Sequence, residues 1–237
     1  MTANPPIIGI IGGFGADTSA TFCARLVAHA HMIKPSHPPA FIVDFVSVPP
    51  ELSSKAINGS REAGAIVAGA VSDSIARLHS IGVKTVALPC NTLHLFAEAF
   101  AVPAPLRLLH IVDAVLQELK NEGITRVGLL ATQLTVSSRL YADRLAASDV
   151  HCITPSASLQ QELSEAIGHF VETGGVSART SQTFRRVFDE FRREGVTTVV
   201  LGCTDLSGMQ ERCGFTARIK CIDSMNVLAK ACAQLCV

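Results

Sequence analysis

The sequence contains no tryptophan, a single tyrosine and no excess of either charge, since 20 Lys and Arg balance 20 Asp and Glu. Proteins that bind nucleic acids or membrane surfaces electrostatically need a basic excess, so this balance argues against both partners. None of the eight cysteines belongs to a C-x-x-C pair, the usual spacing in zinc sites. The most apolar window, residues 63–71, is about half as long as a membrane span. We therefore expect a cytoplasmic protein with reduced thiols, no signal peptide and no metal.

What the sequence does contain is a repeat around two cysteines. Residues 82–90 read GVKTVALPC and residues 195–203 read GVTTVVLGC, so five strand residues, together with Cys90 and Cys203, recur at an offset of 113 positions. Each segment has the pattern of a short buried strand that runs into a turn. The repeat predicts two related halves, each presenting one cysteine at the C-terminal end of a strand.

Strand-like apolar runs alternate with helical patterns along both halves, which predicts an α/β fold of two pseudo-symmetric, doubly wound domains with parallel sheets. We expect residues 1–113 plus 225–237 to form an N-terminal domain carrying Cys90, and residues 114–224 to form a second domain carrying Cys203. Ligands of such sheets bind beyond the carboxyl ends of the strands, where both cysteines are expected.

A glycine-rich turn, Gly12-Gly13-Phe14-Gly15, follows the first predicted strand, and Asp17 or Thr18 is expected to cap the next helix. The dinucleotide-binding fingerprint needs a third glycine that is missing here. A carboxylate on the free backbone amides of this turn is the better interpretation.

Four local expectations concern the connections. We expect a loop from Pro49-Pro50 to about Arg61, and a helix after Cys90 that carries Phe96 and Phe100. Residues 106–111, with a buried His110, are expected to form a strand that closes at Asp113. Thr135 and Ser137 are expected to cap the helix that contains Tyr141.

Two thiols at strand ends have several possible uses. They could bind a metal, but a metal site would need two further soft ligands. They could form a disulfide, but the C-x-x-C motif of redox chemistry is missing. The pair could instead invert a stereocentre, with one thiolate removing a proton from carbon and one thiol returning a proton to the opposite face. A simpler interpretation, two buried structural cysteines, fits one cysteine better than a matched pair followed by polar residues.

These motifs resemble the aspartate/glutamate racemase superfamily, and within it the aspartate racemase branch. The resemblance rests on IGIIGGFG at residues 8–15, CNTLH at 90–94 and GCTD at 202–205, and it extends over essentially the whole chain. It implies a cofactor-independent racemase of two α/β domains with the active site in the cleft between them, acting on a small amino acid and commonly forming a homodimer. Cys90 and Cys203 would be the acid/base thiols. The implied substrate-binding residues are Gly13, Phe14, Gly15, Asn91, Thr92, Thr132, Thr204 and Asp205.

The chain departs from its relatives where an acidic substrate would need positive charge. Lys55 or Arg61 could supply one basic group, whereas Glu172 has the wrong sign at the second position. His94, four residues after Cys90, could orient the site or simply pack. Alternative functions are a maleate-isomerase-like or arylmalonate-decarboxylase-like cysteine enzyme on the same fold, and a catalytically silent binding protein for small carboxylates.

Overall fold

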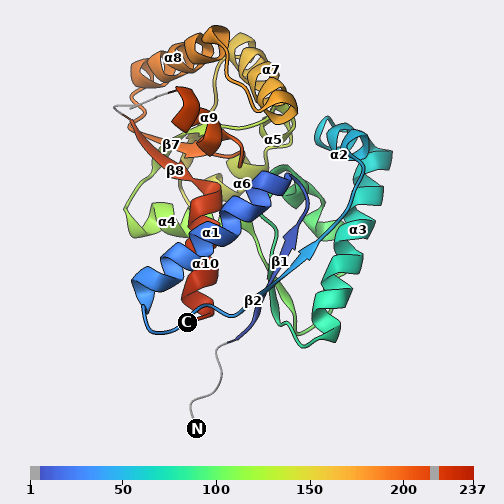
Figure 1. The fold of residues 1–237 in the computed structure, drawn as a ribbon. Coiled ribbons are helices and arrows are strands. Elements are labelled where there is room, and N and C mark those ends of the chain that lie inside the picture. The colour runs from blue at the N-terminus through green and yellow to red at the C-terminus, as the bar shows by residue number, and fades with distance from the viewer. Residues whose placement is uncertain (1–5, 214–218) are drawn as a thin grey trace. The chain divides into compact units, whose positions relative to one another are not determined.

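The computed structural model describes residues 6–213 and 219–237 and divides the chain into two compact units. Unit 1 is Met1–Ala114 with Met225–Val237, and unit 2 is Val115–Ser224. Each unit is built on one sheet of four parallel strands with flanking helices (Figure 1). The prediction of an α/β fold with two related parallel sheets is therefore confirmed.

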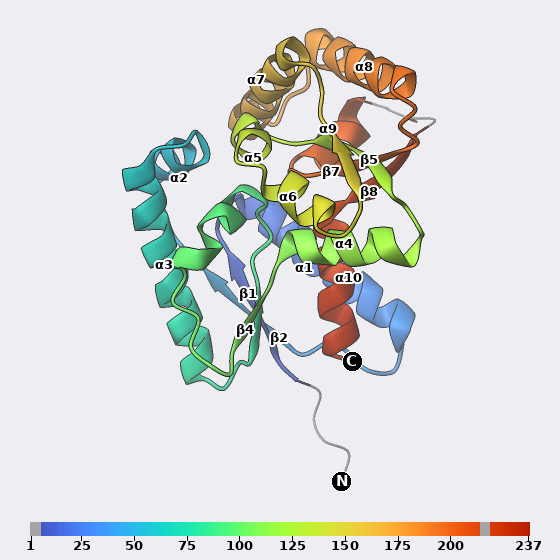
Figure 2. The ribbon, with the colours of Figure 1, turned by 180° about the vertical axis from the view of Figure 1, so that it is seen from behind.

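The sheet of unit 1 has the strand order β2-β1-β3-β4. Figures 1 and 2 show α3 along one side of β1 and β2, and α1 along the other. The elements of this unit are β1 (Ile8–Gly12), α1 (Ala16–Ile33), β2 (Phe41–Phe45), α2 (Pro50–Ile57), α3 (Arg61–Ser80), β3 (Thr85–Ala87), the 3₁₀-helix η1 (Thr92–Ala99), β4 (Arg107–Leu109) and α10 (Ser224–Leu235).

The sheet of unit 2 has the order β6-β5-β7-β8, which is the same arrangement four strands later. The connecting helix α4 (Ile111–Asn121) leads into it from unit 1. Its other elements are β5 (Arg126–Leu130), α5 (Gln133–Ser137), α6 (Leu140–Ala146), β6 (His151–Ile153), α7 (Ala157–Thr173), α8 (Ala178–Arg193), β7 (Thr198–Leu201), α9 (Leu206–Cys213) and β8 (Lys220–Asp223).

Helical periodicity builds the core of each unit. In α3, Val67, Val71, Ile75 and Leu78 recur every three or four residues, and all four lie buried on one face. The hydroxyl of Ser60 caps this helix by accepting from the amide of Ala63 at 3.3 Å. An equivalent stripe on α8 (Phe184, Val187, Phe188 and Phe191) covers the sheet of unit 2 and begins at a capping box between Ser177 and Thr180.

Three of the predicted connections were wrong. The segment after Pro49 begins α2 rather than a loop, because proline is well tolerated in the first turn of a helix. The segment after Cys90 is a 3₁₀-helix that ends before Phe100. The strand after Leu106 stops at Leu109, so Asp113 lies in the first turn of α4 rather than at a strand end.

The predicted helix caps were also wrong. Gly15, and neither Asp17 nor Thr18, occupies the capping position of α1, without a side-chain cap. Thr132 caps α5 in place of Thr135 or Ser137, and Tyr141 lies in the separate helix α6. Across residues 6–213 and 219–237, no helix combines the length and apolar character needed to cross a membrane.

Candidate active site

The glycine turn and Cys90 lie at the same edge of the unit 1 sheet. Strands β1 and β3 pair in parallel, with Ile10 opposite Ala87. Three residues beyond that pair, the two chains reach Gly13 and Cys90 respectively. The prediction that strand ends bring these motifs together is thus supported within this unit by the strand register.

The glycine turn is held by a hydroxyl that the sequence analysis missed. Gly13 and Gly15 have φ angles of 102° and 93°, and a Cβ on Gly13 would lie 2.0 Å from the carbonyl oxygen of Val46. Buried Ser19 accepts from the Gly13 amide at 3.1 Å and donates to the Gly15 carbonyl at 2.9 Å. The Gly13 amide is therefore already engaged, while half-buried Phe14 packs against the core of unit 1.

The turn that carries Cys90 is fixed by a histidine. Leu88 O accepts from the Cys90 amide at 2.9 Å and from Nε2 of His94 at 3.0 Å. Because a carbonyl oxygen can only accept, Nε2 of His94 carries the hydrogen. Cys90, Asn91, Thr92 and His94 are all less than one-tenth exposed. His94 therefore holds the backbone turn at Cys90, and its part in the reaction stays a prediction.

A second histidine, His110, packs against the ring of His94. The rings of His94 and His110 lie 4.4 Å apart between centroids. His110 is buried, as expected, but it lies between β4 and α4 rather than in a strand, and its Nδ1 accepts from the Val112 amide at 3.2 Å. It therefore serves as a side-chain cap at the start of α4.

In unit 2, Thr132 and Cys203 occupy the positions equivalent to Gly13 and Cys90. Leu130 of β5 pairs with Leu201 of β7, and Thr132 and Cys203 each follow two residues later. The Gly202 amide donates to Leu130 O at 2.7 Å, which extends the pairing beyond the strands. Both motifs therefore end at one edge of this sheet.

Hydroxyl and carboxylate groups, rather than a glycine turn, shape this second edge. Thr132 accepts from the Thr135 amide at 3.3 Å and donates its hydroxyl to Thr135 Oγ1 at 3.0 Å. The Cys203 thiol donates to Oδ2 of Asp205 at 3.7 Å. Cys203 and Thr204 are buried, and Asp205 is half-buried. Asp205 therefore contacts the thiol itself, a role that the sequence pattern did not distinguish from substrate binding.

Five of the other six cysteines have thiols with raised pKa values. Burial raises the pKa of the Cys152 thiol to about 12, although Arg139 acts in the opposite direction. Burial also raises the pKa values of Cys23, Cys221, Cys232 and Cys236. A raised pKa keeps these thiols protonated near neutral pH, where they are poor nucleophiles and poor bases. Within the described residues, no group of three His, Cys, Asp or Glu side chains could hold a metal ion.

The three charged residues considered for the substrate's side chain are all exposed. Lys55 lies on α2, Arg61 begins α3, and Glu172 lies near the end of α7. Solvent screens exposed charges strongly, so each of these three would affect the binding of a charged substrate side chain less than a buried charge would.

Residues 11–232 match the family described as Asp/Glu/Hydantoin racemase. The chain belongs to this racemase family.

A full-length relative is the broad specificity amino-acid racemase RacX of Bacillus subtilis, which is 25% identical over 95% of this chain and 96% of its own. The fold is shared with a putative Asp/Glu racemase from Yersinia pestis (TM-score 0.82, 24% identity, 97% and 98% of the two chains). It is also shared with the aspartate racemase of Picrophilus torridus (TM-score 0.77, 24% identity, 97% and 93%).

Proposed function

We propose that this racemase-family protein is a cofactor-independent amino-acid racemase that inverts Cα with the paired thiols of Cys90 and Cys203. The observation that carries the proposal is the equivalence of the two cysteines. Each follows the third strand of a sheet with the same strand order, and each is buried among polar neighbours at the carboxyl edge. An enzyme that treats both faces of one carbon alike needs two such groups.

The reaction balances without an external reagent. For one enantiomer, the Cys90 thiolate takes the Cα proton and leaves a planar carbanion, and the Cys203 thiol gives its proton to the opposite face. Cys90 ends as the thiol and Cys203 as the thiolate, and the roles reverse for the other enantiomer. The hydrogen bond from Cys203 to Asp205 supports this starting state, because a thiol that donates to a carboxylate carries its proton.

The substrate would be held by groups that surround each cysteine. We assign the α-carboxylate and ammonium of the amino acid to Asn91, Thr92, Thr132 and Thr204. These four residues lie next to a cysteine in sequence or at the same sheet edge. The glycine turn would assist through its remaining amides, since Ser19 occupies that of Gly13. The proposal also includes a homodimer, as the resemblance to racemases implies, and a cytoplasmic location, as the composition of the sequence led us to expect.

The decisive test is solvent deuterium uptake at Cα. Individual L-amino acids are incubated with the protein in D₂O, the loss of the Cα proton signal is followed by NMR, and the D-enantiomer is resolved by chiral chromatography. We expect exchange and inversion of at least one amino acid without any added cofactor. Saturable binding without exchange would identify a carboxylate-binding protein, and loss of CO₂ from an arylmalonate would identify a decarboxylase; either result would overturn the proposal.

A further inference from the structure

Unit 2 contains a pocket of about 560 Å³ whose lining includes none of the residues assigned above to the reaction. It lies between α5 and the start of α7, and its lining includes Gln133, Val136, Thr154, Pro155, Gln160 and Gln161. Among the described residues that line it, none is charged. A volume of this size falls within the range of about 300–1,000 Å³ that is typical of small-molecule sites.

The side chain of Gln160 is oriented by the backbone next to Thr132. Its Nε2 donates to Ala131 O at 2.9 Å and to Ser164 Oγ at 3.1 Å. Because a carbonyl oxygen can only accept, the bond to Ala131 fixes which end of the amide carries nitrogen. The position of Oε1 therefore follows from chemistry.

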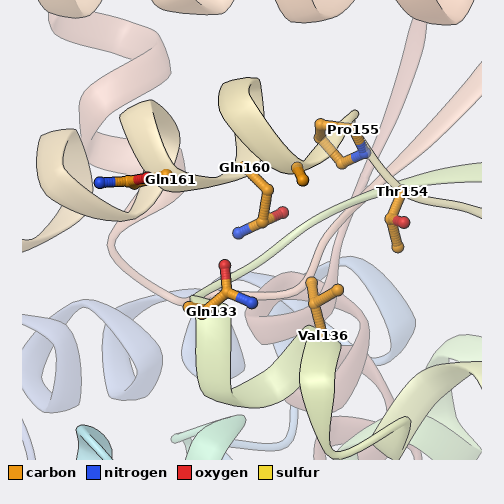
Figure 3. A pocket seen from close by; sticks show the side chains of 7 residues that line it. Gln133, Val136, Thr154, Pro155, Gln160 and Gln161 are labelled. Carbon is orange, nitrogen blue, oxygen red and sulfur yellow. The ribbon is translucent and has the colours of Figure 1, made fainter.

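Oε1 of Gln160 is buried, and no group in the described parts of the chain donates a hydrogen bond to it. The residue as a whole is 3% exposed. Buried carbonyl oxygens in folded proteins nearly always have a donor, and those that lack one need an explanation. In Figure 3, Gln160 projects from α7 toward Gln133 and Val136 of α5, and its oxygen lies on the side of Thr154 and Pro155.

We propose that this pocket binds the primary carboxamide group of a small neutral molecule. A carboxamide has an N–H group for Gln160 Oε1 and a carbonyl oxygen for the exposed amide of Gln133. A carboxylate offers no hydrogen for Oε1 and finds no cation among the lining residues. The pocket should therefore select the amide over the acid of the same shape.

The carboxamide could belong to the side chain of the racemase substrate or to a separate small molecule. Gln160 binds the carbonyl group immediately before Thr132, and Gln133 immediately follows that residue. Both sources involve the same recognition chemistry. The inference does not depend on the two-thiol reaction, since binding can be measured without turnover.

The test uses butyramide and butyrate, which have nearly the same shape and lack the amino-acid group that the proposed active site would bind. Each is titrated into the full-length protein labelled with ¹⁵N, and the side-chain amide signals of Gln160 and Gln133 are followed. We expect saturable shifts with butyramide and binding at least tenfold weaker with butyrate. Equal binding of the two, or no saturable shift with butyramide, would overturn the proposal.

Two variants localise the binding. Val136→Phe should fill the pocket and abolish the shifts while leaving both hydrogen bonds of Gln160 in place, and Gln160→Met should weaken binding at least tenfold. Val171→Phe, on an exposed position of α7 outside the pocket, is the matched control and should bind butyramide normally. Unchanged binding in either pocket variant that remains folded by thermal unfolding would contradict the assignment.

The source of the carboxamide follows from kinetics with any amino acid that is racemised. Competition of butyramide with that substrate, seen as a raised KM at constant kcat, would place the substrate's side chain in the pocket. An effect on kcat, or no effect on rate, would assign the pocket to a separate molecule.

Discussion

Each unit presents a cysteine after the equivalent strand of its own sheet, and different groups lie around the two cysteines. In unit 1 the Cys90 turn is held through the main chain, by His94 on Leu88 O, beside a glycine turn that Ser19 secures. In unit 2 the Cys203 thiol itself meets a carboxylate, beside a threonine-capped helix. The difference teaches that the repeat preserves the position of the cysteine at the end of a strand, while the side chains that contact each turn differ between the two units.

The largest expected effect comes from removing either thiol. Cys90→Ser and Cys203→Ser should each lower racemisation by at least about a thousandfold, because a serine hydroxyl is a far weaker base than a thiolate and inversion needs both groups. One variant should still exchange the Cα proton of one enantiomer, which NMR in D₂O would show. Near-normal turnover of either variant in both directions would end the two-thiol assignment.

The glycine turn offers the next largest effect, on stability. In Gly13→Ala the new Cβ would clash with Val46 O in a backbone region that alanine disfavours, so the free energy of unfolding should fall by about 3 kcal/mol. Gly82→Ala is the matched control. Its φ of 89° is also positive but no atom lies within 4 Å of the new Cβ, so a loss of about 1 kcal/mol is expected in urea unfolding. Equal losses would mean that Val46 moves aside.

His94 tests whether the Cys90 turn is held as described. His94→Phe keeps a ring beside His110 but removes the donor to Leu88 O, which still accepts from the Cys90 amide. We expect a loss of about 1 kcal/mol in stability and a fall of about tenfold in kcat with little change in KM. His94→Gln, whose amide can also donate, should recover part of kcat. A stability loss without any change in kcat would make His94 purely structural.

The smallest effect is expected from the carboxylate beside Cys203. Asp205→Asn removes a negative charge that opposes formation of the thiolate, so Cys203 should lose its proton more readily. In the direction in which Cys203 is the acid, the alkaline limb of the pH–rate profile should move to lower pH, with a severalfold loss of rate at the original optimum. His94→Phe should leave the alkaline limb in place, because His94 holds the Cys90 turn, whereas Asp205 accepts from the Cys203 thiol. A shift shared by both variants would contradict this difference between His94 and Asp205.

The predictions that failed concern connections, where local patterns are weak. Pro49-Pro50 predicts the start of a loop, but a proline can equally well begin a helix, and the segment forms α2. Polar residues at a helix start did not identify the cap either, since Asp17 and Thr18 lie beyond the capping position and Ser19 turns its hydroxyl to the glycine turn. Such choices depend on competing hydrogen bonds of similar energy.

The sequence by itself determined the two parallel sheets and the place of Cys90 and Cys203 at strand ends, because strand and helix periodicities are local and the repeat marks equivalent positions. Only the tertiary structure decided which side chains hold the backbone at these strand ends. The bond of Gln160 to Ala131 joins residues 29 positions apart and exists because the start of α7 packs beside the end of β5. The contact of His94 with Leu88 needs the 3₁₀ turn that the sequence pattern presented as an ordinary helix. Packing selects such contacts from many that sequence spacing permits.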